Sequence, residues 1–478
     1  MKNRMYYMVP LILMIAAACM TLTACGKENR RDTYYEIVNG QIVSKETEQA
    51  EKTKTDDAVI PMGAEGNQGI TAAEAGNIDT ASVSDGVSYV EDDSYNSIAS
   101  DRSGRIELLK MKLETACDAA RESYRTADKG TAMNITLSTK DISSMISAIG
   151  SAGLPAADSL GKLNMQAYEI MNAFGEQLNV STEDLSETYF IVYPDGHLSG
   201  FMLSRESRIW HLYSASAAWN EDEECSIRIY SEGRYAVGEV RYTDKGWLIY
   251  SRDTSDFDEN QKANTDAYVM VRVLPYDSEK RTLCERYVEP VGYLENNLFT
   301  TTWNESNMGP IDFNSLYAYV FSLYNGTDML SSYNVRSYYK AVQGTKLYLV
   351  PEDIFENNTT VYFNIDRSAL KNISDYSASR GGYYFLGYNR DYYNVTPRTP
   401  TPEVVSYTYN TDGTITMVVD AVNKWYGTDR AFRHELTVRP TDGVSFRYVS
   451  NLLYEDENNI LPVQKLSEML NVEREKLN

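Results

Sequence analysis

The sequence predicts an α+β protein in which helices are followed by antiparallel β-meanders. Apolar residues recur at every third or fourth position over 105–127, which is typical of an amphipathic helix. Further along the chain the period changes to two, and the alternating segments are separated by turn sequences rich in Asp and Gly, which indicates hairpins. Residues 25–102 contain few large apolar side chains, so they cannot bury enough surface to offset the entropy of ordering. We therefore expect two α+β domains, 103–303 and 304–478, after a disordered tether.

The first domain is expected to begin with helices and to continue as a meander. Helices are predicted over 105–127, 141–148 and 164–178. Strands are predicted, in chain order, over 188–193, 197–203, 209–215, 225–230, 238–242, 247–252 and 268–274. The sequence Ser231-Glu232-Gly233 is interpreted as a turn between two of these strands.

The second domain is expected to have a similar mixed composition. Helices are predicted over 313–323, 367–373 and 463–476, and the segment 350–355 is interpreted as the end of a strand that runs into a further helix. A second meander is predicted over 404–410, 414–421, 434–439 and 445–450. Prolines at 397, 400 and 402 favour an extended segment before it, because a residue that precedes proline is disfavoured in the helical region.

The N-terminus has the composition of a secretory signal. A cationic start precedes an apolar run over 8–20, and Leu22-Thr23-Ala24-Cys25 is followed at once by polar residues. This pattern resembles the lipobox of bacterial lipoproteins, which implies removal of residues 1–24 and a diacylglyceryl group on the thiol of Cys25. The alternative is an uncleaved anchor, but the apolar run is shorter than the ~20 residues needed to cross a bilayer. We therefore expect a membrane attachment through Cys25, on the outer face of the cell membrane.

Charge and cysteine content limit the classes of partner and the redox chemistry. The formal net charge of −23 disfavours nucleic-acid binding, since such a surface repels phosphate backbones. Besides Cys19 and Cys25 the chain has Cys117, Cys225 and Cys284, an odd number without paired spacing. A Cys225–Cys284 bridge is one interpretation, and buried thiols that pack as small apolar groups are the favoured one.

Tyrosine is unusually frequent, with 38 residues in the chain. Tyrosine favours strands and combines an apolar ring with a polar tip, so these residues are expected mainly to cover half-exposed sheets. The other interpretation is an aromatic platform for sugars or peptides. Its first candidates are Tyr383, Tyr384, Tyr388, Tyr392 and Tyr393.

The sequence contains no motif that predicts a metal site or a cofactor. His197, His211 and His434 lie in or beside predicted strands without HxxxH, HxH or CxxC spacing. His434, which is followed by Glu435, is the best metal candidate, and a structural role is favoured for it. Phosphate-loop and dinucleotide motifs are absent from the sequence. The acidic stretches 220–224 and 253–266 are candidates for weak calcium binding, but they lack calcium-loop spacing, so solvated turns are favoured.

Serine and carboxylate chemistry is also weakly indicated. Two S-x-x-K sequences occur, Ser337 with Lys340 and Ser368 with Lys371, but the further motifs of penicillin-binding enzymes are missing, so chance matches are favoured. A pair of catalytic carboxylates is assembled in space rather than in sequence, so the sequence neither supports nor opposes one.

Several short motifs together resemble a known group of proteins. They include Asp244-Lys245-Gly246-Trp247, Val288-Glu289-Pro290-Val291-Gly292-Tyr293, Phe313-Asn314-Ser315-Leu316-Tyr317, Val350-Pro351-Glu352-Asp353-Ile354-Phe355-Glu356, Asp412-Gly413-Thr414 and His434-Glu435-Leu436. Their order over about 135–450 is similar to that in uncharacterised cell-surface lipoproteins of Gram-positive, Clostridia-type bacteria. That resemblance implies a location and an architecture, and no catalytic or binding residue.

These observations favour a non-catalytic, lipid-anchored surface protein that binds a cell-wall polymer or a protein partner. The first alternative is an extracytoplasmic hydrolase that acts on a cell-wall or glycan substrate, which would need two convergent carboxylates, one of them desolvated. The second is a structural or assembly component, which would present a flat apolar patch.

Overall fold

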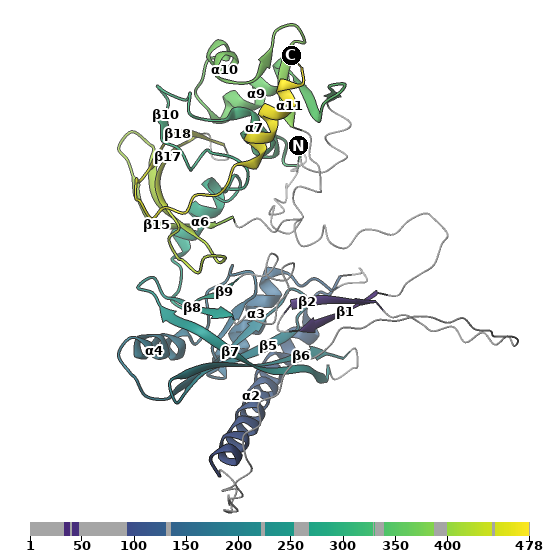
Figure 1. The fold of residues 1–478 in the computed structure, drawn as a ribbon, viewed down its shortest axis with the longest axis vertical. Helices are drawn as coiled ribbons and strands as arrows, with labels where there is room; N and C mark the ends of the chain where they lie inside the picture. Colours follow the sequence, from purple (N-terminus) through teal and green to yellow (C-terminus); the bar gives the residue numbers. More distant parts are fainter. Residues whose placement is uncertain are drawn as a thin grey trace, which may run out of the picture. The chain divides into compact units, whose positions relative to one another are not determined.

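The fold is described from a computed structural model of the chain (Figure 1). It describes residues 33–38, 41–46, 93–130, 135–220, 225–252, 267–327, 329, 339–386, 399–441 and 445–477. By its internal contacts the folded body Leu109–Asn478 is one compact unit, and Cys25–Leu108 is a second. The α+β prediction is confirmed. No helix in the described ranges is long and apolar enough to cross a membrane.

The N-terminal unit contains elements that the sequence interpretation did not include. β1 (Thr33–Val38) pairs with β2 (Gln41–Glu46) in an antiparallel hairpin, and α2 (Asp93–Thr126) begins well before residue 105. Tyr, Ile and Val favour strands in the first two segments, and Asn39-Gly40 between them is a strong hairpin sequence. The rest of the predicted tether, the signal 1–24 and Cys25 lie outside the described residues.

The first half of the folded body is built on a seven-stranded sheet with the order β3-β4-β5-β6-β7-β8-β9. Only the short β3 is parallel to its neighbour; the other strands form an antiparallel meander. The strands are β3 (Ala156–Asp158), β4 (Leu185–Val192), β5 (Leu198–Glu206), β6 (Ile209–Trp219), β7 (Ile227–Tyr242), β8 (Trp247–Arg252) and β9 (Tyr268–Arg272). The meander predicted here is therefore present.

One turn in this meander was predicted wrongly. Ser231-Glu232-Gly233 lies inside the long strand β7, which replaces the two strands expected over 225–242. Ser231 pairs with Ser216 and Ile229 pairs with Ala217, so the residue between them is a β-bulge. The bulge places the extra residue without ending the strand, and the long partner β6 continues the pairing on both sides.

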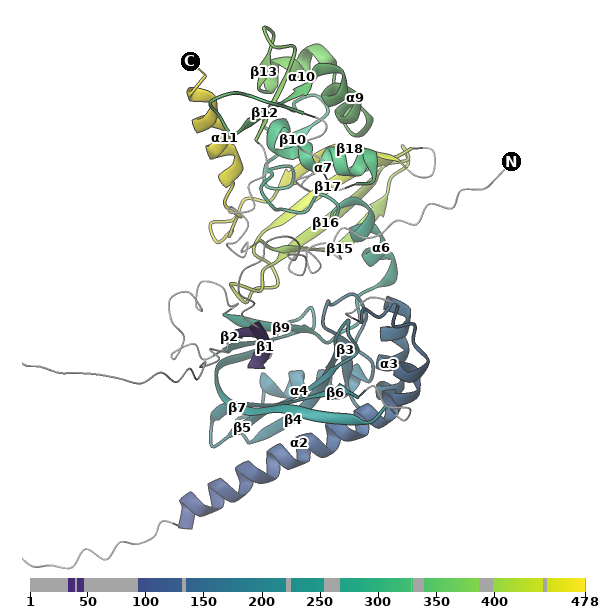
Figure 2. The same ribbon diagram turned by 90° about the vertical axis from the view of Figure 1, so that its right-hand side faces the viewer.

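Helices cover both faces of this sheet (Figure 2). Met171 and Phe174 of α4 (Tyr168–Leu178) pack with Tyr189 and Leu203 on one face. The C-terminal part of α2 lies on the other, where a Cβ atom built on Gly200 would be 3.1 Å from Leu109. α3 (Thr139–Ser151) contacts β3 and β4 and is capped by Ser138, which accepts a hydrogen bond from the Asp141 amide.

The second half contains two further sheets. A five-stranded sheet has the order β10-β18-β17-β16-β15, and a four-stranded sheet has the order β11-β12-β14-β13. The strands of the first are β10 (Trp303–Asn304), β15 (Thr401–Tyr409), β16 (Ile415–Val422), β17 (Arg433–Pro440) and β18 (Phe446–Leu453); those of the second are β11 (Lys340–Ala341), β12 (Leu347–Pro351), β13 (Tyr376–Ser377) and β14 (Gly382–Leu386).

Helices connect these two sheets through one aromatic core. The helices are α6 (Ser278–Tyr287), α7 (Phe313–Asn325), α9 (Glu352–Tyr362), α10 (Arg367–Ile373) and α11 (Lys465–Glu475). α9 contacts β18 of the larger sheet and both β12 and β14 of the smaller one. Of these helices only α6 was not expected. Its N-cap residue, Asp277, accepts a hydrogen bond from the Lys280 amide.

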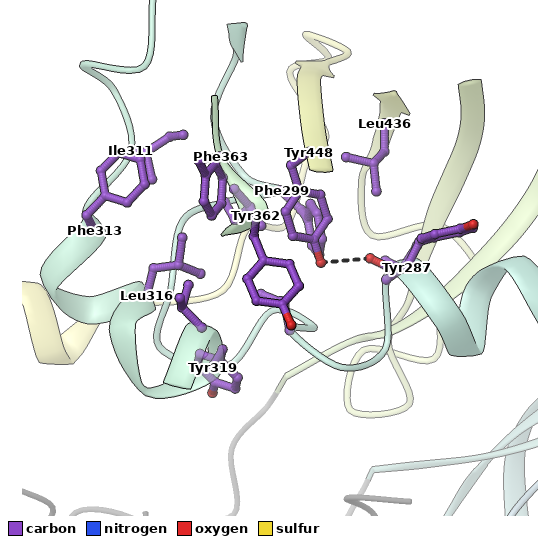
Figure 3. Close-up of a cluster of buried hydrophobic side chains, with 14 of the residues drawn as sticks. Tyr287, Phe299, Ile311, Phe313, Leu316, Tyr319, Tyr362, Phe363, Leu436 and Tyr448 are labelled. Carbon is purple, nitrogen blue, oxygen red and sulfur yellow. Dashed lines mark hydrogen bonds between the residues drawn. The ribbon is translucent and has the colours of Figure 1, made fainter. Parts of the chain in front are cut away.

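Tyrosine supplies much of that core (Figure 3). Tyr448 is fully buried between Phe363 and Phe446, and its hydroxyl donates to the Tyr287 carbonyl at 3.0 Å. The prediction that tyrosines mainly cover half-exposed sheets therefore explains only part of their number, because several of the largest fully buried side chains are tyrosines. The core begins at Leu283, before the boundary predicted at 303/304. That boundary stays a prediction.

Candidate functional site

A dense set of ionisable groups surrounds the start of α9. We call it the α9 carboxylate cluster; its members are Glu352, Glu356, Arg367, Lys371, Tyr376 and Tyr383. Glu352 and Glu356 are four residues apart on one helix, so both carboxylates lie on the same face. Lys371 comes from α10, Tyr376 from β13 and Tyr383 from β14, so the cluster joins four elements.

The two carboxylates have different environments. Glu356 is 1% exposed and accepts hydrogen bonds from the Tyr383 hydroxyl at 3.0 Å and from Arg367 at 3.3 Å. Glu352 is more accessible, and it is 2.5 Å from both Lys371 Nζ and the Tyr376 hydroxyl. Lys371 Nζ also lies 3.5 Å from Glu356, so one ammonium group bridges both carboxylates.

This geometry determines the protonation states. Hydrogen bonds from Lys371 and Tyr376 lower the pKa of Glu352, and the bond to Glu352 raises the pKa of Lys371. Glu352 is therefore ionised at neutral pH and cannot serve as a proton donor, which the acid of a hydrolase pair must do. Lys371 is charged and occupied, so it is not poised to deprotonate Ser368 on the same helix.

Replacing Tyr383 tests whether this cluster holds the fold together. Tyr383→Phe removes the hydroxyl that donates to the buried Glu356, and we expect a loss of about 2 kcal/mol in the free energy of unfolding, the usual value for a bond to a charged group. Urea unfolding followed by tryptophan fluorescence measures it. Tyr376→Phe, at the exposed end of the cluster, is the control and should cost less. Equal effects of the two changes would contradict the assignment.

The tyrosines proposed for an aromatic platform do not form one together. Tyr383 is fully buried and stacks on Phe355 at 4.0 Å, so it cannot present its face to a sugar. Tyr384 is half-buried and points to the opposite side of β14. Tyr388, Tyr392 and Tyr393 lie outside the described residues.

His434 has a structural environment. It is fully buried, and burial lowers its pKa to about 4. Nδ1 is 2.7 Å from Asn451 Oδ1, and Nε2 is 3.0 Å from the Tyr293 hydroxyl. Because the Asn451 amide donates to the Thr301 carbonyl, its oxygen faces the ring, so Nδ1 carries the proton and Nε2 accepts from Tyr293. Both ring nitrogens are used, and neither is directed at a metal.

The other two histidines also contact neighbouring side chains. His197 Nδ1 is 2.5 Å from Asp195, and His211 Nε2 accepts from Arg234 at 2.8 Å. Within the described residues, no group of three or more His, Cys, Asp or Glu side chains is placed to hold a metal ion. Of the acidic stretches, 221–224 and 253–266 lie outside the described residues, as does Ser337.

The three cysteines that the structure describes, Cys117, Cys225 and Cys284, are free and buried. Cys225 lies against α2, where its carbonyl accepts from Arg121 at 3.3 Å, whereas the Cys284 thiol donates to the Pro402 carbonyl at 3.3 Å. The Cys225–Cys284 bridge is therefore not formed. Burial raises the pKa of Cys117 to about 12, so this thiol is not a reactive thiolate.

A second ionic cluster, not predicted from the sequence, joins the seven-stranded and five-stranded sheets. We call it the charged junction; it consists of Lys245, Arg272, Glu403, Asp420 and Arg433. Asp420 is fully buried and accepts from Lys245 at 2.7 Å and from Arg433 at 2.6 and 2.9 Å. Glu403 accepts from Arg272 at 2.5 Å and from the Trp247 indole at 3.0 Å.

Chain neighbours of the junction complete the contact between the sheets. Val422 packs with Ile249 and Met270, and the Tyr276 hydroxyl bonds to the backbone of Val404. Gly427 has a φ of +59°, and a Cβ atom built on it would be 2.5 Å from the ring of Tyr268. The two sheets are therefore joined by specific contacts, and both pairs of charges are satisfied across the junction.

The fold and these clusters define an α+β protein with two ionic networks and a buried aromatic core. The chain belongs to the family of unknown function DUF6070, whose match covers residues 107–466. No curated protein and no solved structure matches it. The family agrees with the resemblance to an uncharacterised group, while the lipoprotein character and the Clostridia-type origin stay predictions.

Proposed function

We propose that this chain is a lipid-anchored extracytoplasmic protein with a non-catalytic binding role at the cell envelope. The observation that carries the proposal is Leu22-Thr23-Ala24-Cys25, which follows an apolar run and precedes an abruptly polar segment. A diacylglyceryl group supplies two acyl chains, and two membrane signals are what stable anchoring requires. The folded body then lies outside the cell, more than eighty positions along the chain from its anchor.

The ionic clusters support the non-catalytic part of this proposal. In the α9 carboxylate cluster Glu352 is ionised, and in the charged junction Arg433 and Lys245 overcome the effect of burial and lower the pKa of Asp420. A lowered carboxyl pKa at Glu352 and Asp420 does not suit the proton donor of a hydrolase, so these two residues lend no support to the hydrolase alternative. The partner we propose is a cell-wall polymer or an envelope protein. Incubation of the purified body with isolated wall and glycan panels, followed by sedimentation, would count against a wall partner if nothing retained it.

Cys25→Ser tests the anchor. We expect the variant to lose incorporation of labelled palmitate and to move from the detergent phase to the aqueous phase in Triton X-114 partitioning, because no thiol remains to carry the lipid. Cys19→Ser is the matched control, since Cys19 lies in the segment that cleavage would remove. Persistent labelling of the Cys25→Ser variant would contradict the proposal.

A further inference from the structure

The four-stranded sheet of the second half is apolar on both faces. On one face Val350, Tyr383 and Phe385 belong to the main aromatic core. On the other, Leu347 pairs with Leu386 and Leu349 pairs with Tyr384, which forms a two-by-two apolar surface on neighbouring strands. A sheet with such a second face requires a cover, since large exposed apolar patches are uncommon unless they bind something.

The cover is the C-terminal helix α11. Leu470 is buried against Leu347 and Leu386, and Met469 and Leu477 pack at the edges of the same cluster. The match to the family ends at residue 466, where α11 begins, so most of this helix lies outside the matched residues. The apolar face that α11 covers, on β12 and β14, lies inside them.

Polar contacts fix the orientation of α11 on this surface. Glu473 is 4% exposed and accepts a hydrogen bond from the Lys346 amide at 2.9 Å, next to the start of β12. Ser467 donates to Asp312 at the beginning of α7, and Arg474 pairs with Asp375 beside β13. The contacts at Ser467, Leu470 and Glu473 repeat every three residues along the helix. This is close to the i, i+3, i+4, i+7 spacing of the anchoring residues in helices that bind to apolar surfaces.

The helix α11 depends on these contacts for its stability. It has eleven residues, and its N-cap residue Gln464 makes no capping hydrogen bond through its side chain. A helix of this length is not stable in water without docking. Of its described apolar side chains only Leu470 is buried, and Val472 on the outer side is 56% exposed. The segment before it contains the exposed residues Leu461 and Val463.

We propose that the surface formed by Leu347, Leu349, Tyr384 and Leu386 is a helix-binding groove, which α11 occupies as an internal ligand. The partner that fits it is an amphipathic helix of an envelope protein with the α11 pattern: a hydroxyl, a leucine three residues later and a carboxylate three residues after that. The leucine packs on the apolar face of β12 and β14, and the carboxylate accepts from the Lys346 amide. The partner would displace α11, and this groove does not depend on the lipid anchor.

A labelled peptide tests the groove in the full chain. The probe is a synthetic peptide of residues 463–478, and binding is followed by fluorescence anisotropy. Leu470→Ala in the protein weakens its own α11, so we expect this variant to bind the peptide at least ten-fold more tightly than the unsubstituted chain. Val472→Ala is the matched control on the exposed side of the same helix and should bind like the unsubstituted chain. A peptide that itself carries Leu470→Ala should not bind.

Two outcomes would overturn the proposal. One is that a folded Leu470→Ala protein, with an unchanged far-ultraviolet circular dichroism spectrum, fails to bind the peptide. If that variant does not fold, Ser467→Ala combined with Arg474→Ala removes only polar contacts of α11 and should show the same direction of change; its failure to do so also contradicts the groove. The other is a dimer of the unsubstituted chain that the peptide dissociates, which would make a second copy the occupant instead.

Discussion

Asp420→Asn is expected to destabilise the protein by about 3–5 kcal/mol, the usual cost of removing one partner from a buried ion pair. Asp420 is fully buried, and Lys245 and Arg433 both donate hydrogen bonds to it. An amide at this position keeps the shape but removes the negative charge to which Lys245 and Arg433 both donate. Denaturant unfolding should show a lower midpoint with an unchanged slope if the native state keeps its compactness.

Two matched variants separate the charge effect from a general loss of packing. Asp429→Asn removes a carboxylate 3.8 Å from the same Lys245 Nζ, outside hydrogen-bonding distance, and should cost only a fraction as much. Adding Lys245→Met to Asp420→Asn removes one of the stranded cations and should recover part of the loss, so the two changes are not additive. A loss below about 1 kcal/mol for Asp420→Asn would show that the charged junction contributes little to stability.

The charged junction also shows why the ionic clusters could not be predicted from the sequence. Asp244-Lys245-Gly246 is recognisable as a turn, but its partner Asp420 is 175 residues away and lies in a strand with an ordinary alternating pattern. The spacing of Glu352 and Glu356 on one helix is visible in the sequence, whereas the approach of Lys371 and Tyr383 depends on how α10 and β14 pack. Ionic clusters of this kind are products of tertiary structure.

Helices and strands were predicted from the sequence more accurately than these ionic clusters. α10 and β8 have the predicted limits, because a short apolar period and flanking polar residues define them. α6 was not predicted because its ten residues are mostly polar or charged, although Leu283, Cys284 and Tyr287 are buried and Asp277 caps it. The error at Ser231-Glu232-Gly233 has a different cause, since pairing with β6 overrides a turn-forming sequence.

Acid should destabilise the protein through His434, by about 3 kcal/mol between neutral pH and pH 4. Burial lowers the pKa of His434 from 6.5 to about 4 in the folded protein. At neutral pH the ring is uncharged in both states, so it causes no difference in stability. As the pH falls below 6.5 the unfolded chain binds a proton that the folded protein does not, so unfolding becomes progressively favoured until about pH 4.

Replacement of the ring isolates this contribution. His434→Gln has no titrating group at this position. Its free energy of unfolding should be lower at neutral pH, where the bonds to Tyr293 and Asn451 are lost, but should decline less between pH 6.5 and 4.

Titration of Asp420 does not contribute in the same pH range. Its pKa is lowered from 3.8, so its stabilisation is present above that pH and is lost only below it. His197→Gln, between β4 and β5, is the control, because it leaves His434 and its bonds to Tyr293 and Asn451 unchanged and should therefore keep the decline that His434 causes. Parallel profiles for His434→Gln and the unsubstituted chain would mean that the buried ring is not the source of the acid sensitivity, and that protonation at His434 is accommodated by Tyr293 and Asn451 without loss of the fold.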